Sequence, residues 1–161
     1  MKRRLTGATR AIAYGEDGST EIAYTGTSAK YLNNAYNVGV DFSADEIDVT
    51  AFGDYPWKAK EPGFLDLSIS LSLRHQVVNG ELADDVEFME SHCYSRTPFR
   101  IAIIDDRTST TPNGHIFSVV ATKASSSGEF SGAQDHSYTL TRAESTLPPM
   151  RIVAGVTEAF V

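Results

Sequence analysis

The amino-acid sequence predicts a mainly β protein: a β-sandwich or partly open barrel of two antiparallel sheets with one flanking α-helix. Several segments alternate apolar and polar residues with a period of two, which places the apolar side chains on one face of a strand. Only one segment has helical spacing, and glycine, serine and threonine are plentiful. The chain has 161 residues, 41% of them hydrophobic, which is long enough for one well-buried domain and short for two.

The clearest strand covers residues 64–74. Its odd positions are leucine or isoleucine and its even positions from 66 onward are polar, so a period of two gives one apolar and one polar face. At roughly 3.3 Å per residue the strand reaches about 36 Å, well beyond the usual five or six residues. A polar face of this length is able to line a larger surface, and its residues are Asp66, Ser68, Ser70, Ser72 and Arg74.

Residues 47–51 also alternate, and an aromatic loop joins them to the long strand. Pro56 and Pro62 remove backbone donors, so neither strand is expected to continue through the loop. Two interpretations of the loop aromatics Phe52, Tyr55 and Trp57 remain open. They fold back as a lid on the core, or they anchor an interface, since tryptophan and tyrosine bury a large area at low entropic cost.

The remaining strands follow from shorter β-prone or alternating segments. We expect residues 43–46 to form a turn between two strands and residues 125–128 to form a loop. Asn113-Gly114 is a strong hairpin signal. Residues 150–161 are expected to form a last strand or a docking arm. The other predicted strands are residues 10–14, 20–25, 38–43, 99–104, 115–124 and 138–142.

One helix is predicted between the two halves of the β structure. Leu82, Val86, Met89 and Cys93 fall on one stripe at helical spacing, and acidic residues crowd the first half, where the helix dipole favours negative charge. Cys93 therefore lies on the buried face, and we expect inert packing there.

Composition and motifs argue against several classes of function. The single cysteine excludes an intrachain disulfide framework and a cysteine-based zinc site. The four histidines are scattered, and the sequence has no nucleophile elbow, so we expect no enzyme activity, no cofactor and no metal. No run approaches the roughly 18 apolar residues that span a bilayer, so we expect no membrane partner. The net charge of −7 argues against gripping nucleic acid, although it suits a surface past which DNA slides.

The segment from Asp48 to Ser70 resembles the tail tube (major tail) proteins of long-tailed bacteriophages. The resemblance rests on structural residues and extends loosely over residues 11–146. The Lys58-Ala59-Lys60 insert and the segment after Pro149 depart from the family pattern. The matching positions are Asp48, Val49, Thr50, Phe52, Gly53, Gly63, Asp66, Ser68 and Ser70.

The resemblance implies one tail-tube domain over residues 1–161, with possible arms at 1–9 and 147–161. Family members assemble as hexameric rings that stack into a hollow tube, and one sheet of each subunit joins its neighbours' around the lumen. The lumen first holds the tape-measure protein and later passes genomic DNA without specific binding. Other implied partners are the tail terminator and baseplate proteins. The implied location is the virion tail, with assembly in the host cytoplasm.

The resemblance also suggests roles for individual residues. The lumen-facing residues would be Asp66, Ser68, Ser70 and Ser72, and the subunit or ring interface would contain Phe52, Tyr55, Trp57 and Lys58. Three other readings remain open. The chain is a tube subunit of a gene-transfer particle or a contractile injection system, a monomeric β-sandwich binding module for carbohydrate, or, least favoured, an enzyme.

Overall fold

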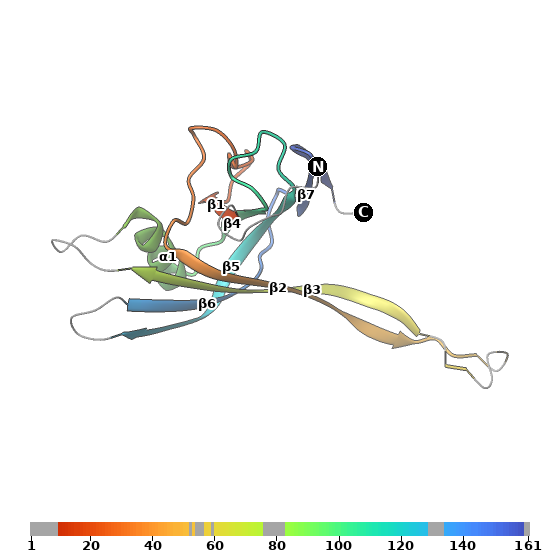
Figure 1. Ribbon diagram of the computed structural model, residues 1–161. Coiled ribbons are helices and arrows are strands. Elements are labelled where there is room, and N and C mark those ends of the chain that lie inside the picture. The colour runs from red at the N-terminus through yellow and green to blue at the C-terminus, as the bar shows by residue number, and fades with distance from the viewer. Residues whose placement is uncertain are drawn as a thin grey trace.

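Antiparallel pairing joins the strands of the described residues into one sheet. The computed structural model describes residues 10–51, 53, 57–58, 60–75, 83–128 and 134–159. These contain eight strands and one helix (Figure 1). In chain order they are β1 (Ala11–Glu16), β2 (Ala35–Asp48), β3 (Lys60–His75), α1 (Asp84–Ser95), β4 (Phe99–Ile104), β5 (Gly114–Gly128), β6 (Gln134–Arg142), β7 (Met150–Val153) and β8 (Val156–Ala159).

The strand order is β1-β4-β5-β6-β3-β2, and β7 pairs with both β5 and β8. The first part of β5 pairs with β4, and residues 119–128 pair with β6. The register shifts between Ala121 and Lys123, and such a bulge bends a strand. The bent β5 thereby serves both layers of a sandwich. One layer holds β1, β4 and the first half of β5, and the other holds the second half of β5 with β6, β3 and β2.

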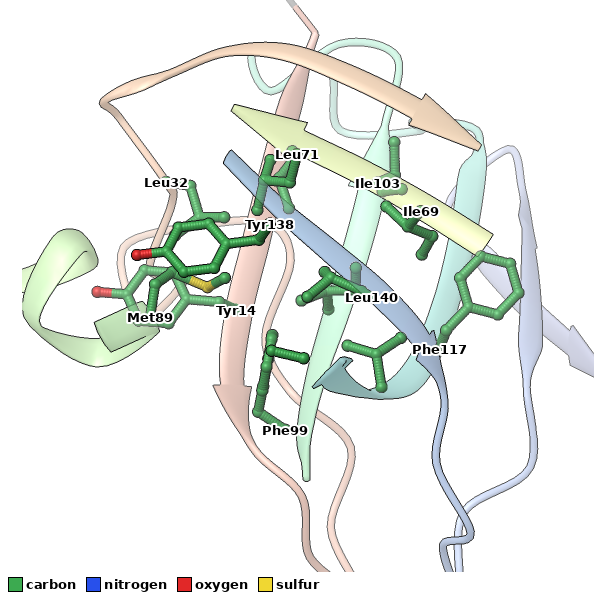
Figure 2. Packing of buried hydrophobic residues seen from close by; sticks show 14 of the residues in the cluster. Tyr14, Leu32, Ile69, Leu71, Met89, Phe99, Ile103, Phe117, Tyr138 and Leu140 are labelled. Atoms are coloured by element: carbon green, nitrogen blue, oxygen red, sulfur yellow. The ribbon is translucent and has the colours of Figure 1, made fainter. Parts of the chain in front are cut away.

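The main core lies between these two layers (Figure 2). Side chains of β1 and β4 on one side pack with those of β3 and β6 on the other, and Met89 of α1 closes the cluster. The predicted fold class is therefore confirmed as mainly β with a flanking helix, although hydrogen bonding makes one continuous sheet that is not closed into a barrel. Fully burying one leucine or isoleucine contributes roughly 1.5–3 kcal/mol. The fully buried apolar residues include Ile69, Leu71, Leu73, Phe99, Ile101, Phe117 and Leu140.

The alternation predicted for β3 is confirmed over the part that crosses the sandwich. Leu67 and the three apolar residues that follow it at alternate positions are at most 4% exposed. Leu65 is the exception, with 61% of its surface exposed. The prediction that Leu65 is buried was wrong, because β3 pairs with β6 only from Ser68 onward, and at Leu65 it pairs with β2 alone.

The helix begins later than its apolar stripe suggests. Ala83 occupies the position before α1 and makes no side-chain cap, whereas Leu82 lies outside the described residues. Val86 and Met89 are buried and Cys93 is half-buried against the core, as predicted. No helix among the described residues has the length and apolar character needed to cross a bilayer.

Two polar contacts that the sequence did not predict fix α1 to its surroundings. The carboxylate of Asp85 accepts hydrogen bonds from the backbone N–H and the side-chain amide of Asn34, at 2.9 and 2.7 Å. The Nδ1–H of buried His92 donates to the carbonyl of Phe88 at 2.9 Å, while Nε2 lies 2.9 Å from the carboxylate of Glu16. The helix is thus attached to β1 and to the segment before β2.

Four segment predictions were wrong. One is that Pro62 ends the strand, because β3 begins at Lys60 and pairs with β2 through Pro62. The other three concern residues 43–46, 125–128 and 20–25. Residues 43–46 are not a turn, because β2 continues through them to Asp48 with a bulge between Ala44 and Glu46. Residues 125–128 are not a loop, because β5 runs to Gly128 against β6. Residues 20–25 form no strand, and the partner of β1 is β4. Segments 43–46 and 125–128 are polar and exposed, so strand pairing leaves no apolar alternation in their sequence.

A buried arginine joins three distant parts of the chain. Arg100 of β4 is 0% exposed, and its guanidinium holds the carboxylate of Glu21 in a two-point contact at 2.6 and 2.8 Å. The same guanidinium donates to Ser118 Oγ and to the carbonyl of Pro148, both at 2.8 Å. Arg100 therefore attaches the segments around residues 21 and 148 to the sheet.

The alkaline stability of the protein is expected to depend on Tyr138. Burial, with a smaller effect of the Glu90 carboxylate, raises the pKa of Tyr138 to about 12, whereas a tyrosine in an unfolded chain ionises near about pH 10. Between these values the unfolded state loses a proton that the folded state keeps, so the free energy of unfolding falls as pH rises. Tyr138→Phe should reduce this fall in denaturant unfolding measured at several pH values. An unchanged slope above pH 10 would contradict the assignment.

Candidate functional site

The polar residues of β3 belong to a much wider polar surface. Directly paired residues of antiparallel strands point to the same face of a sheet. Each polar residue of β3 therefore belongs to a row of side chains that crosses the neighbouring strands on the same face. Ser70, for example, lies between Gly39 of β2 and Thr139 of β6, and Thr139 pairs with Lys123 of β5. We call the resulting surface the polar face: Asn37, Gly39, Asp41 and Ser43 of β2; Asp66, Ser68, Ser70, Ser72 and Arg74 of β3; Asp135, Ser137, Thr139 and Thr141 of β6; and Lys123, Ser125 and Ser127 of β5.

Except at its edge, where Thr141 pairs with Val120 of β5, the polar face contains only hydroxyl, amide, charged and glycine residues, and it lies on the side of the layer opposite the core. An ion pair joins β3 to β6, the two middle strands of the layer. Arg74 Nε donates to Asp135 Oδ1 at 2.7 Å and Arg74 Nη2 donates to Oδ2 at 3.2 Å. The hydrogen bond from Arg74 lowers the pKa of the Asp135 carboxyl. The Arg74 guanidinium also lies 4.8 Å from the ring centre of Tyr36, at the end of the face.

The structure thus places the four predicted lumen-facing residues on one continuous surface. Ser68 and Ser72 are half-buried, whereas Asp66 and Ser70 are exposed. The neighbouring hydroxyls of β6 and β5 were not singled out from the sequence. A period of two in residues 137–141 was visible, but only the strand pairing places these residues beside Ser70 and Ser72.

Beyond the sandwich, β2 and β3 continue as a paired hairpin. We call this extension the hairpin arm, residues 43–51, 53, 57–58 and 60–66. Figure 1 shows it projecting from the rest of the sheet, toward the right of the view. Ile47 and Leu65 of the arm are 51% and 61% exposed. Phe42 lies at the base of the arm, 44% exposed, with its ring centre 5.8 Å from that of Phe117. Apolar side chains therefore continue from the core out along the arm.

The far end of the hairpin arm holds two of the predicted interface residues, Trp57 and Lys58. The side chain of Trp57 is 79% exposed, so it does not cover the core in this structure, and Lys58 is exposed as well. Phe52 and Tyr55 lie outside the described residues. At the end of β2, Asp48 accepts hydrogen bonds from the backbone N–H and hydroxyl of Thr50, which lower the pKa of its carboxyl. Lys60 and Glu46 form an ion pair across the arm.

The layer that carries the polar face ends in two open edges. Among the described residues, β2 pairs only with β3, and residues 120–128 of β5 pair only with β6. An unpaired edge presents a row of backbone N–H and C=O groups that another strand is able to pair. Neighbouring strands of the layer are antiparallel throughout, so the two edge strands β2 and β5 run in opposite directions.

A groove also lies beside α1. Residues of α1, of β1 and of the segment around Asn33 line it, including His92 and Glu16. In the part of the chain that the structure describes, no three histidine, cysteine, aspartate or glutamate side chains are placed to hold a metal ion. The polar face, its two edges and the hairpin arm are therefore the surfaces that require a functional explanation.

No family model and no curated protein sequence matches the chain. Solved structures do. A structure of the SPP1 tail tube matches with a TM-score of 0.64 and 12% identity, over 93% of this chain and 80% of that one. A chain in the tail of a gene transfer agent (GTA) particle, computed with C6 symmetry, matches with a TM-score of 0.60 and 15% identity, over 88% and 96%.

A chain of the six-fold symmetrised baseplate of the anti-feeding prophage (AFP) matches with a TM-score of 0.59 and 8% identity, over 89% of this chain and 95% of that one. The chain has the tail-tube fold. The expectation from residues 48–70 is thus confirmed at the level of the fold. Because these identities are low, the matches show the fold of this chain alone. A similar assembly of this chain is a proposal.

Proposed function

We propose that this chain is the structural subunit of a phage tail tube, assembling as stacked hexameric rings into a hollow conduit for DNA delivery. The observation that carries the proposal is the layer with a polar face on one side, the core on the other and an open edge at each end. A soluble monomer usually protects such edges with short strands or a covering element. Here β2 has 14 residues, the outer side of β5 is unpaired over residues 120–128, and no described strand pairs with either edge.

The strand directions suit closure into a ring. Because β2 and β5 run in opposite directions, the β5 edge of one copy pairs with the β2 edge of the next as an antiparallel joint. The same joint repeats around the ring and leaves no edge open. The six-fold symmetry used for the GTA tail and the AFP baseplate supports six copies.

The polar face would line the bore. Ser68, Ser70 and Ser72 lie between β2 and β6 on this face, and Asp66 lies where the face meets the hairpin arm. Hydroxyls with few charges offer DNA no cluster of lysine and arginine to grip, and the net charge of −7 opposes phosphate adhesion. The tape-measure protein would occupy this bore before the genome passes through it. The tail terminator and baseplate proteins would contact the ends of the tube, in a virion tail assembled in the host cytoplasm.

The hairpin arm would make the contacts between subunits or successive rings. Stacking requires head-to-tail contacts that propagate without closing, and the arm extends away from the body of its own subunit. Trp57 and Lys58 are exposed at its end, and Phe52 and Tyr55 belong to the same loop in the sequence. In the assembly Trp57 would be buried as an interface anchor.

Trp57→Ala is expected to leave the monomer folded and to weaken assembly. The side chain is 79% exposed, so its loss should change the free energy of unfolding by less than about 0.5 kcal/mol. Loss of an aromatic anchor typically costs an interface about 2 kcal/mol or more, which corresponds to at least about a 30-fold rise in the concentration needed for assembly. Denaturant unfolding and sedimentation measure the two effects. Tyr94→Ala, which removes an 80% exposed aromatic from α1, is the matched control.

Electron microscopy of the purified protein across a concentration series tests the proposed function itself. Hollow rings or tubes of uniform bore are the expected result. A protein that remains monomeric at every concentration, also in the presence of tail-initiating complexes, would argue for the binding-module alternative. Binding to a glycan array would then support that alternative.

A related device of the same fold fits the comparisons equally well. The TM-scores to the SPP1 tail tube, the GTA tail and the AFP baseplate chain differ by at most 0.05, so the fold alone does not choose among them. A gene-transfer particle or a contractile injection system would use the same polar bore and the same arm. Co-purification of a sheath protein would distinguish the contractile device.

A further inference from the structure

The two open edges of the layer carry opposite charges on the polar face. Lys123 is the charged residue of the polar face on β5, immediately after the bulge. On β2 the charged residue of the polar face is Asp41, and Asp45 follows it by four residues at the start of the hairpin arm. None of these three side chains forms a hydrogen bond or ion pair with another described residue. By contrast, Arg74 and Asp135 in the middle of the layer pair with each other.

We propose that Lys123 of each subunit pairs with the carboxylates of Asp41 and Asp45 on the β2 edge of the adjacent copy. This inference rests on the proposed function, because it requires that the β5 and β2 edges of adjacent copies meet. It adds the register of that joint. The occupant of each edge is a second copy of this chain, as opposite charge on the two edges indicates.

The register within the subunit determines how far the strands must shift. Lys123 lies in the same row as Thr139, Ser70 and Gly39. In a joint without stagger, Lys123 would face Gly39 of the next copy, and Asp41 would be a diagonal neighbour at about 7–8 Å between Cα atoms, within reach of a long side chain. Closing a sheet into a barrel tilts the strands and staggers their register. A stagger toward the hairpin arm would shift Lys123 along β2 of the next copy, past Asp41, so that it faces Ser43 and lies near Asp45.

The pair gives the joint a direction. A stagger of the opposite sense would place Lys123 near Asn37 and the start of β2, where the polar face has no carboxylate. Serine-rich edges specify their register weakly, because one hydroxyl substitutes for another. The ion pair would therefore select one register among several, and it would leave the wall of the bore with fewer unpaired charges at the joint.

Engineered cross-links measure this register. In a Cys93→Ala background, Lys123→Cys is combined separately with Asp41→Cys, Asp45→Cys or Asn37→Cys, and assembled tubes are treated with a short bis-methanethiosulfonate cross-linker, because diagonal neighbours lie too far apart for a direct disulfide. Asn37→Cys is the matched control, because it lies on the same strand and face in the opposite direction. We expect inter-subunit cross-links with Asp41→Cys or Asp45→Cys, and at most about a tenth as much with Asn37→Cys.

The possible results distinguish a wrong ion pair at the joint from a failure of the chain to assemble. Tubes that cross-link mainly through Asn37→Cys, or through none of the three, would overturn the proposed pair while leaving the tube function intact. A Cys93→Ala parent that forms no rings or tubes where the native chain does would point to the background substitution, and Cys93→Ser then replaces it. Failure of the native chain to assemble overturns both the joint and the proposed function.

Charge reversal provides a second readout. Lys123→Glu should raise the concentration needed for half-assembly by more than about tenfold at low salt, because like charges would then face each other at every joint. Adding Asp41→Lys and Asp45→Lys should restore assembly, and the difference should shrink as salt screens the charges. Lys30→Glu makes the same change of net charge in the exposed segment before β2 and should leave assembly unchanged. Equal effects of Lys123→Glu and Lys30→Glu would overturn the pair.

Discussion

Arg100→Met is expected to lower the free energy of unfolding of the monomer by about 3 kcal/mol, the lower end of the range for breaking a buried ion pair. Methionine has a similar length but no donor, so the Glu21 carboxylate, Ser118 Oγ and the Pro148 carbonyl all lose a partner. The lower end applies because the side chain of Glu21 is 30% exposed and keeps access to water. Denaturant unfolding of dilute, monomeric protein measures the change.

Glu21→Gln and Arg142→Met complete this test. Glu21→Gln should also destabilise, because it leaves the guanidinium of fully buried Arg100 without a counter-charge. Arg142 is exposed at the end of β6, so Arg142→Met should stay within about 0.5 kcal/mol. A loss below about 1 kcal/mol for Arg100→Met would contradict the role given to this residue.

Gly114→Ala is expected to cost about 3 kcal/mol, at the upper end for overpacking. A Cβ at this position would lie 2.0 Å from the carbonyl oxygen of Ile103 and 2.9 Å from its carbonyl carbon. These are backbone atoms of the paired strand β4, so no side-chain rotation relieves the contact. The start of β5 would have to separate from β4, which also disturbs the pairing of β5 with β7.

Gly39→Ala is the matched control for Gly114→Ala. Both glycines lie in strands, but the nearest atom to a Cβ at Gly39 is Ser70 Cβ at 4.0 Å. Alanine at a compatible strand position removes freedom from the unfolded chain and typically stabilises by about 0.4–1 kcal/mol. Thermal or denaturant unfolding should therefore show opposite signs for the two substitutions. A similar stability for both variants would contradict the close approach at Gly114.

Sequence patterns predicted the parts of the fold where one face of an element is buried. The strand at residues 99–104 was predicted with the bounds that the structure gives, and the buried positions of β3 follow its alternation from Leu67 to Leu73. In these segments the buried positions are apolar, with the exception of Arg100. The same rule failed at Leu65, because the hairpin arm projects from the sandwich and both of its faces meet solvent in the monomer.

Features that depend on partners far along the chain were not predictable from local patterns. Arg100 reads as a polar residue in an apolar strand, and only its contact with Glu21, 79 residues away, explains its burial. The serines of β3 were recognised as a possible lining, but the width of the polar face depends on β6 and β5 lying beside them. Residues 43–46 were read as a turn because polar residues in an exposed strand resemble a turn.

The central claim is that the polar face lines the bore of an assembly of this chain. Bulky maleimide labelling of assembled tubes tests it directly, with Ser70→Cys on the polar face compared with Tyr94→Cys on α1, both in the Cys93→Ala background. Ser70 and Tyr94 are both exposed in the monomer, on opposite sides of the layer. Both cysteines should react in the monomer, and in intact tubes only the one at position 94 should react. Equal labelling of both positions in intact tubes would contradict the claim.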